Sequence, residues 1–409
     1  MHNYLARQPV FDRRKRLFAY EILYRGNLDN VFPENFDGEV ATSTVLAHAL
    51  INIGLETITA GKKALINFTE KHLLDGTPTQ LPQQYCIVEI LEDVPASEPV
   101  LAACRELKRH GYTLALDDFN FDQRLDPLVD CVDIIKVDFQ AASLEEIQGA
   151  MDRYRGHGKL KFLAEKIETY EEFERSLGMG FHFFQGFFFS KPELIRRRKL
   201  DIAAVSLLTL MAEVNRPDFS FKRVEKMISA DVALSYKLLL YINSAFYSLV
   251  SKVKSIRHAL SYLGESGTRQ FVCLAVTSQL AVTKTSELIR AAMVRAQLSK
   301  LLAKKSHLDY DESELFLLGL FSLLEAMLDT PIKDLLAKLS LAPDLNAALS
   351  DRSGPLAPFL CTILAYETGN LDECLQHLEE IGVSSEDMVT LYFEALKWAD
   401  LFSEEMPDT

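Results

Sequence analysis

The sequence lacks the features that mark several classes of protein. Its six cysteines show no CxxC spacing, which argues against a zinc ribbon or a thioredoxin-like redox motif. Several of them lie in apolar runs, so we expect reduced thiols in the core of a cytoplasmic protein. Arg7 and Asp12 interrupt the N-terminal stretch early, so we expect no secretory signal peptide.

Positive charge and long apolar runs are also scarce. The 44 Lys and Arg residues are outnumbered by 58 Asp and Glu residues, which gives a net charge of −14 and argues against a nucleic-acid partner. No apolar run approaches about 20 residues, so we expect no membrane span. One basic cluster, residues 196–199, is more typical of the solvated face of a linking helix than of an anion-binding surface.

The first half of the chain alternates short apolar runs with amphipathic stretches. Two strand-like segments, residues 4–11 and 17–23, flank a polar turn and predict a hairpin. Beyond them, strand and helix patterns alternate up to residue 185, which indicates parallel strands covered by helices. With about seven such strands, a (β/α) barrel of the TIM type fits best.

The second half changes to helical periodicity. From residue 200 onward strand-like runs vanish, so we expect an all-α domain after an α/β barrel, with domains over residues 1–195 and 196–409. Residues 231–246 are apolar on nearly all sides and predict a central buried helix. Gly264 is expected to end a helix that begins near residue 255.

Polar side chains recur where the predicted strands end. Asp117 and Asp118 follow one apolar run, and Lys136 lies in the next. Because carboxyl ends of barrel strands meet at one mouth, we expect a shared site there. Paired carboxylates beside a lysine favour a divalent-metal site acting on phosphate esters. The alternative is that the aspartates cap the following helix and that Lys136 is solvated. The strand-end set is Glu21, Asn67, Glu89, Asp117, Asp118, Lys136, Glu165 and Gln185.

About the first 195 residues resemble the EAL domain family, the metal-dependent phosphodiesterases that open cyclic di-GMP. The resemblance is carried by motifs in the family's order. In this sequence they read RQPVFD from Arg7, YEILYR from Tyr20, INFT from Ile66, VEILE from Val88, DDF from Asp117, DIIKVD from Asp133, AEKIE from Ala164 and QGFFFSKP from Gln185.

The resemblance implies a site for two Mg²⁺ or Mn²⁺ ions. Glu21, Asn67, Glu89 and Asp117 would ligate the first ion, and Asp117, Asp118 and Glu165 the second. Lys136 would orient the attacking water, so Lys136 and Glu165 are the expected catalytic residues. The expected ligand-binding residues are Gln8, Arg25, which would contact a phosphate, Glu168, Gln185 and Pro192.

The chain also departs from the family's pattern around this site. Residues 120–125 replace a glycine-containing loop, and Lys166 stands where the family has glycine. The expected metal ligands are retained, but the residues around them differ from the family's pattern. This combination predicts a degenerate barrel, inactive or weakly active, that senses cyclic di-GMP or a partner. The alternative hypothesis is an active phosphodiesterase that produces pGpG.

The second half resembles the HDOD domain, a helical relative of HD phosphohydrolases. The segment from Val253 to Gly264 and the run GLFSLLE from Gly319 carry this resemblance. None of the nine histidines is followed by aspartate, so the metal-binding dyad of HD enzymes is absent. We expect a non-enzymatic module that binds a signalling protein. The resemblance also makes a homodimer a hypothesis, because barrels of the EAL family commonly pair.

Overall fold

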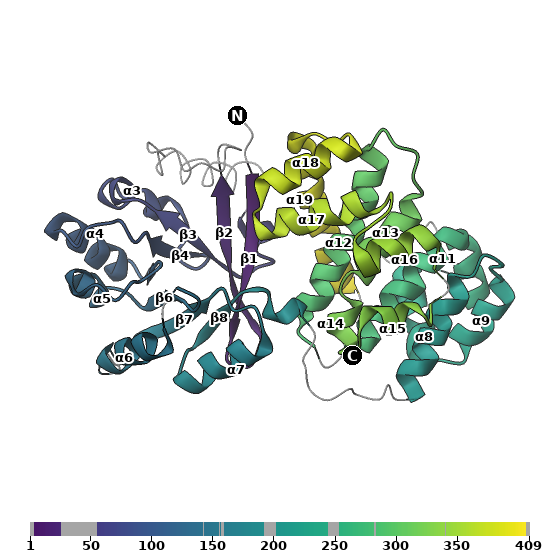
Figure 1. Cartoon of the computed structure of the whole chain (residues 1–409), viewed down its shortest axis with the longest axis horizontal. Helices are drawn as coiled ribbons and strands as arrows, with labels where there is room; N and C mark the ends of the chain where they lie inside the picture. Colours follow the sequence, from purple (N-terminus) through teal and green to yellow (C-terminus); the bar gives the residue numbers. More distant parts are fainter. Residues whose placement is uncertain are drawn as a thin grey trace. The chain divides into compact units, whose positions relative to one another are not determined.

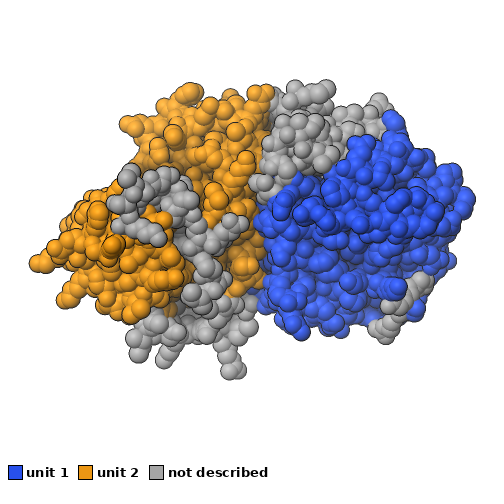
Figure 2. Space-filling view, turned by 180° about the vertical axis from the view of Figure 1, so that it is seen from behind, with its two compact units in different colours: residues 1–191 blue, residues 192–409 orange. Residues whose placement is uncertain are grey.

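The computed structural model describes most of the chain in two compact units, residues 1–191 and 192–409 (Figure 2). The sequence placed the domain boundary after residue 195, a position outside the described residues. The expected helix over residues 39–54 and the basic cluster at 196–199 also lie outside them. The described residues are 4–25, 55–141, 143–154, 156, 159–191, 202–243, 253–281, 284–339 and 341–405.

The first unit is a closed barrel of eight strands in sequential order (Figure 1). β1 (Tyr4–Asp12) and β2 (Leu17–Arg25) form the predicted antiparallel hairpin, and β1 closes the barrel by pairing antiparallel with β8. Neighbouring strands from β2 to β8 pair in parallel, so the predicted barrel is confirmed. The remaining strands are β3 (Lys63–Phe68), β4 (Cys86–Ile90), β5 (Thr113–Leu116), β6 (Ile134–Asp138), β7 (Lys161–Glu165) and β8 (Phe183–Gln185).

The barrel interior is filled by one buried apolar side chain from each strand. Such a layer makes the barrel a packed core rather than a pore, and it leaves the strand ends to carry polar groups. The layer consists of Val10, Ala19, Leu65, Ile87, Ala115, Ile134, Leu163 and Phe183. The helices of this unit are α2 (Leu55–Ile58), α3 (Glu70–Leu74), α4 (Glu98–Arg109), α5 (Asp126–Val129), α6 (Leu144–Tyr154) and α7 (Tyr170–Met179).

The second unit is helical in all the elements described, which confirms the predicted all-α domain. Gly264 takes φ 67° and interrupts α11, so the predicted helix end is a break between two helical segments. The helices are α8 (Ile202–Val214), α9 (Phe221–Ser229), α10 (Val232–Ile242), α11 (Ile256–Leu280), α12 (Ser286–Lys305), α13 (Glu312–Phe321), α14 (Leu324–Leu328), α15 (Ile332–Leu336), α16 (Pro343–Asp351), α17 (Ala357–Thr368), α18 (Leu371–Ile381) and α19 (Ser385–Glu405).

The predicted central helix, residues 231–246, is wrong in its burial. The described part, α10, leaves Val232 85% exposed and Tyr236 56% exposed. The buried helix is instead α13, where every residue from 315 to 321 is buried. Gly319 allows this packing, because a Cβ there would meet the carbonyl oxygen of Arg295 on α12 at 2.1 Å. Apolar composition therefore did not distinguish a central helix from a peripheral one.

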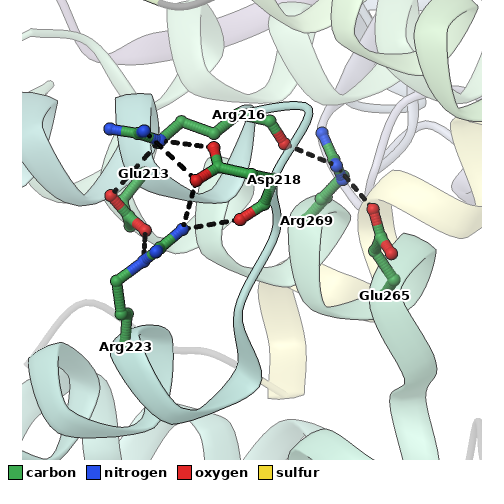
Figure 3. A network of polar contacts seen from close by, with 6 residues as sticks. All are labelled: Glu213, Arg216, Asp218, Arg223, Glu265 and Arg269. Carbon is green, nitrogen blue, oxygen red and sulfur yellow. Dashed lines mark hydrogen bonds and ion pairs between the residues drawn. The ribbon is translucent and has the colours of Figure 1, made fainter.

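An exposed polar network joins α8, α9 and α11 in this unit (Figure 3). Arg216 and Arg223 share the carboxylate of Asp218, and Arg223 also pairs with Glu213. Arg269 on α11 donates to the carbonyl oxygen of Arg216 at 3.1 Å. Within the described ranges, no helix has both the length and the apolar content that a bilayer crossing needs.

Candidate metal centre

The barrel gathers the predicted strand-end residues at one mouth. Glu89 on β4 pairs in register with Asn67 on β3. Asp117 follows β5 directly, and its N–H donates to the carbonyl oxygen of Ile90 at 2.9 Å. Glu165 and Gln185 end β7 and β8. The sequence therefore placed these side chains correctly at the carboxyl ends of the parallel strands, whereas Glu21 lies in the middle of β2.

Lys136 is the common partner of four carboxylates. Its side chain is 1% exposed, so it is not the solvated lysine of the alternative interpretation. Its Nζ lies 2.7 Å from Asp117 Oδ1, 2.9 Å from Glu165 Oε1 and 3.4 Å from Glu21 Oε2, and it also pairs with Glu89 Oε1. One buried cation therefore holds together acidic groups from β2, β4, β7 and the loop after β5.

Three carboxylates form a second grouping beside this lysine. Asp117, Asp118 and Glu165 offer oxygen atoms that all lie within 4.8 Å of one another. Asp118 is exposed and takes φ 36°, a conformation that non-glycine residues seldom adopt. Such strain persists where the surrounding structure enforces it, as it commonly does at functional sites.

Burial controls protonation in this centre. It raises the pKa of Glu89 well above its usual range and the pKa of Glu165 to about 8, although Lys136 opposes both shifts. Burial also opposes the charged form of Asp117, but Lys136 prevails and lowers the pKa of Asp117. For Lys136 itself, the surrounding carboxylates outweigh burial and hold its pKa well above the usual value. The centre thus holds more carboxyl groups than one lysine keeps ionised.

The free oxygen atoms fit a hard divalent cation. Among the described residues, the buried atoms Glu89 Oε2, Glu165 Oε2 and Gln185 Oε1 have no hydrogen-bond partner. A buried acceptor without a partner is costly, and Mg²⁺ or Mn²⁺ would satisfy it with the oxygen ligands that these ions prefer. Carboxyl groups that one lysine does not keep ionised, together with unpartnered oxygens, therefore point to cation binding.

Gln185 is oriented by two hydrogen bonds that leave its carbonyl oxygen available. Its Nε2 donates to Gln8 Oε1 at 2.8 Å and to Glu21 Oε2 at 2.6 Å. Gln8 lies at this mouth because β1 runs antiparallel to both of its neighbours. These contacts link β1, β2 and β8 beside the candidate metal ligands.

Gly186 is a structural requirement of the site that sequence reasoning did not identify. It takes φ 144°, and a Cβ there would meet the carbonyl oxygen of Ile167 at 2.0 Å. The N–H of Ile167 donates to the carbonyl oxygen of Gln185 at 2.9 Å, so the two loops touch through their main chains. The glycine after Gln185 in the QGF motif was the available signal.

One predicted ligand-binding residue, Glu168, is not brought into this cluster. Glu168 is exposed and pairs with Lys191 Nζ at 3.0 Å, and that pairing lowers the pKa of Glu168. The side chain of Arg25 and the whole of Pro192 lie outside the described residues.

The altered loop after Asp118 is tied to its surroundings by aromatic contacts. The N–H of Phe119 donates to the carbonyl oxygen of Lys136 at 3.0 Å. The Phe119 ring packs edge-on against Phe121 and Tyr154, with centroids 5.6 and 5.8 Å apart. Tyr154 in turn donates to Asp126 at 2.5 Å. The loop is therefore anchored without glycine.

Comparison with known proteins matches both halves of the chain. The EAL domain model matches residues 2–192 and the HDOD domain model matches residues 202–327. The chain is 36% identical to "Cyclic di-GMP phosphodiesterase CdgJ" of Vibrio cholerae, over 97% of this chain and 92% of that protein. It is 34% identical to "Uncharacterized protein YuxH" of Bacillus subtilis, over 97% and 98% of the two chains. Among solved structures it is similar to the Bacillus subtilis YkuI protein in complex with cyclic di-GMP and calcium, at 19% identity and a TM-score of 0.37, over 46% of this chain and 54% of that chain.

Proposed function

The chain belongs to the family of proteins that join an EAL domain to an HDOD domain, as its motifs predicted, and from this membership we propose that it hydrolyses cyclic di-GMP to linear pGpG. The observation that carries this proposal is the set of acidic side chains around Lys136. Support also comes from CdgJ, a relative over nearly the whole chain whose name is that of a cyclic di-GMP phosphodiesterase.

The proposed roles follow the positions of the side chains. Two divalent ions, when bound, would activate a water molecule and stabilise charge at phosphorus. One ion would be held by Glu21, Asn67, Glu89 and Asp117, and the other by Asp117, Asp118 and Glu165. We propose that the ions are Mg²⁺ or Mn²⁺, since oxygen ligands suit both.

The chain's own residues would position the reacting groups. Lys136 would orient the attacking water, and Glu165, 2.9 Å from its Nζ and ionised when a divalent cation is bound beside it, would accept the water's proton. As the P–O bond breaks, the leaving oxygen would take a proton from solvent and become the free hydroxyl of pGpG. Gln185 would complete the site through its free carbonyl oxygen. Arg25 would contact a phosphate, and Gln8, Glu168 and Pro192 would line the ligand.

A second candidate is a sensor that binds cyclic di-GMP without cleaving it. It is favoured by one observation, the replacement of the family's glycine by Lys166 next to Glu165. The predicted loss of activity stays a prediction. In either case we propose that the helical unit binds a signalling protein. We also propose that the chain acts in the cytoplasm and that it forms a homodimer through its barrels.

The deciding experiment is a calorimetric titration of the full-length protein with cyclic di-GMP in Mn²⁺, followed by chromatography of the mixture for pGpG. Turnover by the wild type, lost in Glu21→Gln and kept in the exposed control Glu106→Gln, is the expected result. Binding without pGpG would refute hydrolysis and establish the sensor. Absence of binding would refute both.

A further inference from the structure

Lys166 occupies a backbone conformation that suits glycine better than lysine. It follows Glu165 at the end of β7 and takes φ 55°. A non-glycine residue in this left-handed region costs about 1 kcal/mol or more. The chain nevertheless places a lysine beside a residue of the candidate metal centre.

The ammonium and the carbonyl group of Lys166 are bonded to the end of β6 and to the loop that follows it. Its Nζ bonds Asp138 Oδ2 at 2.5 Å, and its carbonyl oxygen accepts from Gln140 Nε2 at 3.0 Å. The other oxygen of Asp138 accepts from the N–H groups of Gln140 and Ala141, at 2.8 and 3.2 Å. The ammonium is therefore paired with Asp138, although the Lys166 side chain is 57% exposed.

This ion pair lies next to the second group of carboxylates. Asp138 pairs in register with Glu165 across β6 and β7, and Glu165 shares a 4.8 Å cluster with Asp117 and Asp118. Lys166 itself directly follows Glu165 in the chain, so its ammonium, paired with Asp138, lies beside this cluster. Like charges repel, so an ammonium at this position opposes a cation bound between these carboxylates.

We propose that Lys166 is a positioned positive charge that weakens binding of the second divalent ion at Asp117, Asp118 and Glu165. The second position then fills only at a higher ion concentration than the position around Glu21 and Glu89. Because it concerns that ion, the proposal rests on the metal-dependent function proposed above and names a residue that sets its metal requirement.

The test is a calorimetric titration of the nucleotide-free, full-length protein with Mn²⁺. We expect Lys166→Met, which keeps the length and loses the charge, to tighten the weaker Mn²⁺ site about fivefold or more. Lys166→Arg keeps the charge and should keep the wild-type affinity. The matched control is Lys161→Met at the opposite end of β7, which removes the same charge from an exposed position and should leave the affinity unchanged.

Equal Mn²⁺ affinity in Lys166→Met and the wild type would overturn the proposal. Equal tightening in Lys161→Met would also overturn it, because net charge alone would then explain the effect. If either result is found and the wild-type protein still hydrolyses cyclic di-GMP, the proposed function stands although the role of Lys166 is refuted. Absence of Mn²⁺ binding in every protein would overturn both. If Lys166→Met does not fold, Lys166→Asn serves, since asparagine tolerates positive φ.

Discussion

The ammonium nitrogen of Lys136 lies 2.9 Å from a carboxylate oxygen of Glu165, and both side chains are almost completely buried at the mouth of the barrel. Three further carboxylates share the same nitrogen. In the absence of divalent ions, Lys136 is the one described cation that contacts all four acids. Its removal should therefore lower the stability of the metal-free barrel.

Lys136→Met should destabilise the metal-free barrel by about 3–5 kcal/mol, because removing one partner leaves buried charge uncompensated. Hydrogen exchange of the barrel strands in a chelator measures this. Saturating Mn²⁺ should reduce the loss by supplying positive charge. The control is Lys108→Met, which removes a half-exposed pair with Asp133 and should cost under about 1 kcal/mol. Equal losses with and without Mn²⁺ would contradict the assigned role.

Asp118→Asn should weaken Mn²⁺ binding at the second position by at least about tenfold, because an amide is a poorer ligand than a carboxylate. Mn²⁺ calorimetry gives the affinity, and circular dichroism confirms that the fold is kept. Asp122→Asn is the matched control, since Asp122 lies in the same loop but binds Arg124 instead. If the two variants bind Mn²⁺ alike, Asp118 is not a ligand.

His182 should lower the stability of the barrel as the pH drops below about 6.5, the ordinary pKa of histidine, whereas the raised pKa values of Glu89 and Glu165 act in the opposite direction. Burial lowers the pKa of His182, and Arg13 and Lys161 add to the shift. Its Nδ1 accepts a hydrogen bond from the N–H of Phe162 at 3.3 Å, which requires the neutral ring. As the pH falls below the pKa that His182 has in the unfolded chain, the unfolded chain binds more protons than the folded one. The contribution of His182 to the free energy of unfolding therefore decreases between its unfolded and its folded pKa.

Urea denaturation of wild type and His182→Asn at pH 5 to 8, in a chelator, tests this effect. Asparagine keeps an acceptor but does not titrate, so on acidification the stability of the variant should rise relative to that of the wild type. Parallel pH profiles for the two proteins would show that His182 does not contribute.

Arg295→Met should lower the free energy of unfolding of the helical unit by about 3–5 kcal/mol. Arg295 on α12 binds both oxygens of Glu367 on α17, with its Nη2 at 2.6 Å, and also donates to Ser322 at 3.1 Å. Trp398 is the single tryptophan and lies on α19, so its fluorescence reports on this unit. Arg223→Met, in the exposed network of Figure 3, should change the transition little. If the two variants lower the free energy of unfolding by similar amounts, burial of the ion pair does not explain the effect of Arg295→Met.

The sequence by itself determined which residues meet at the mouth. Whether a residue lies at the end of a strand depends on a few neighbouring residues. The sequence shows directly where a short apolar run ends and where the next helix begins. Asp117, Glu89 and Glu165 were therefore found without knowing their partners. The order of the EAL motifs then identified the family, and the change of period after residue 200 separated the helical unit.

Tertiary structure alone decided which atoms pair. Glu21 and Gln185 are 164 residues apart and share a hydrogen bond only because β1 closes the barrel against β8. The choice of α13 over α10 as the buried helix depends on neighbours that composition does not encode. The same holds for Lys166, whose ammonium bonds Asp138 rather than Glu165. A side chain's partner is set by the closure of the whole barrel, whereas its place at a strand end is set by the few residues around it.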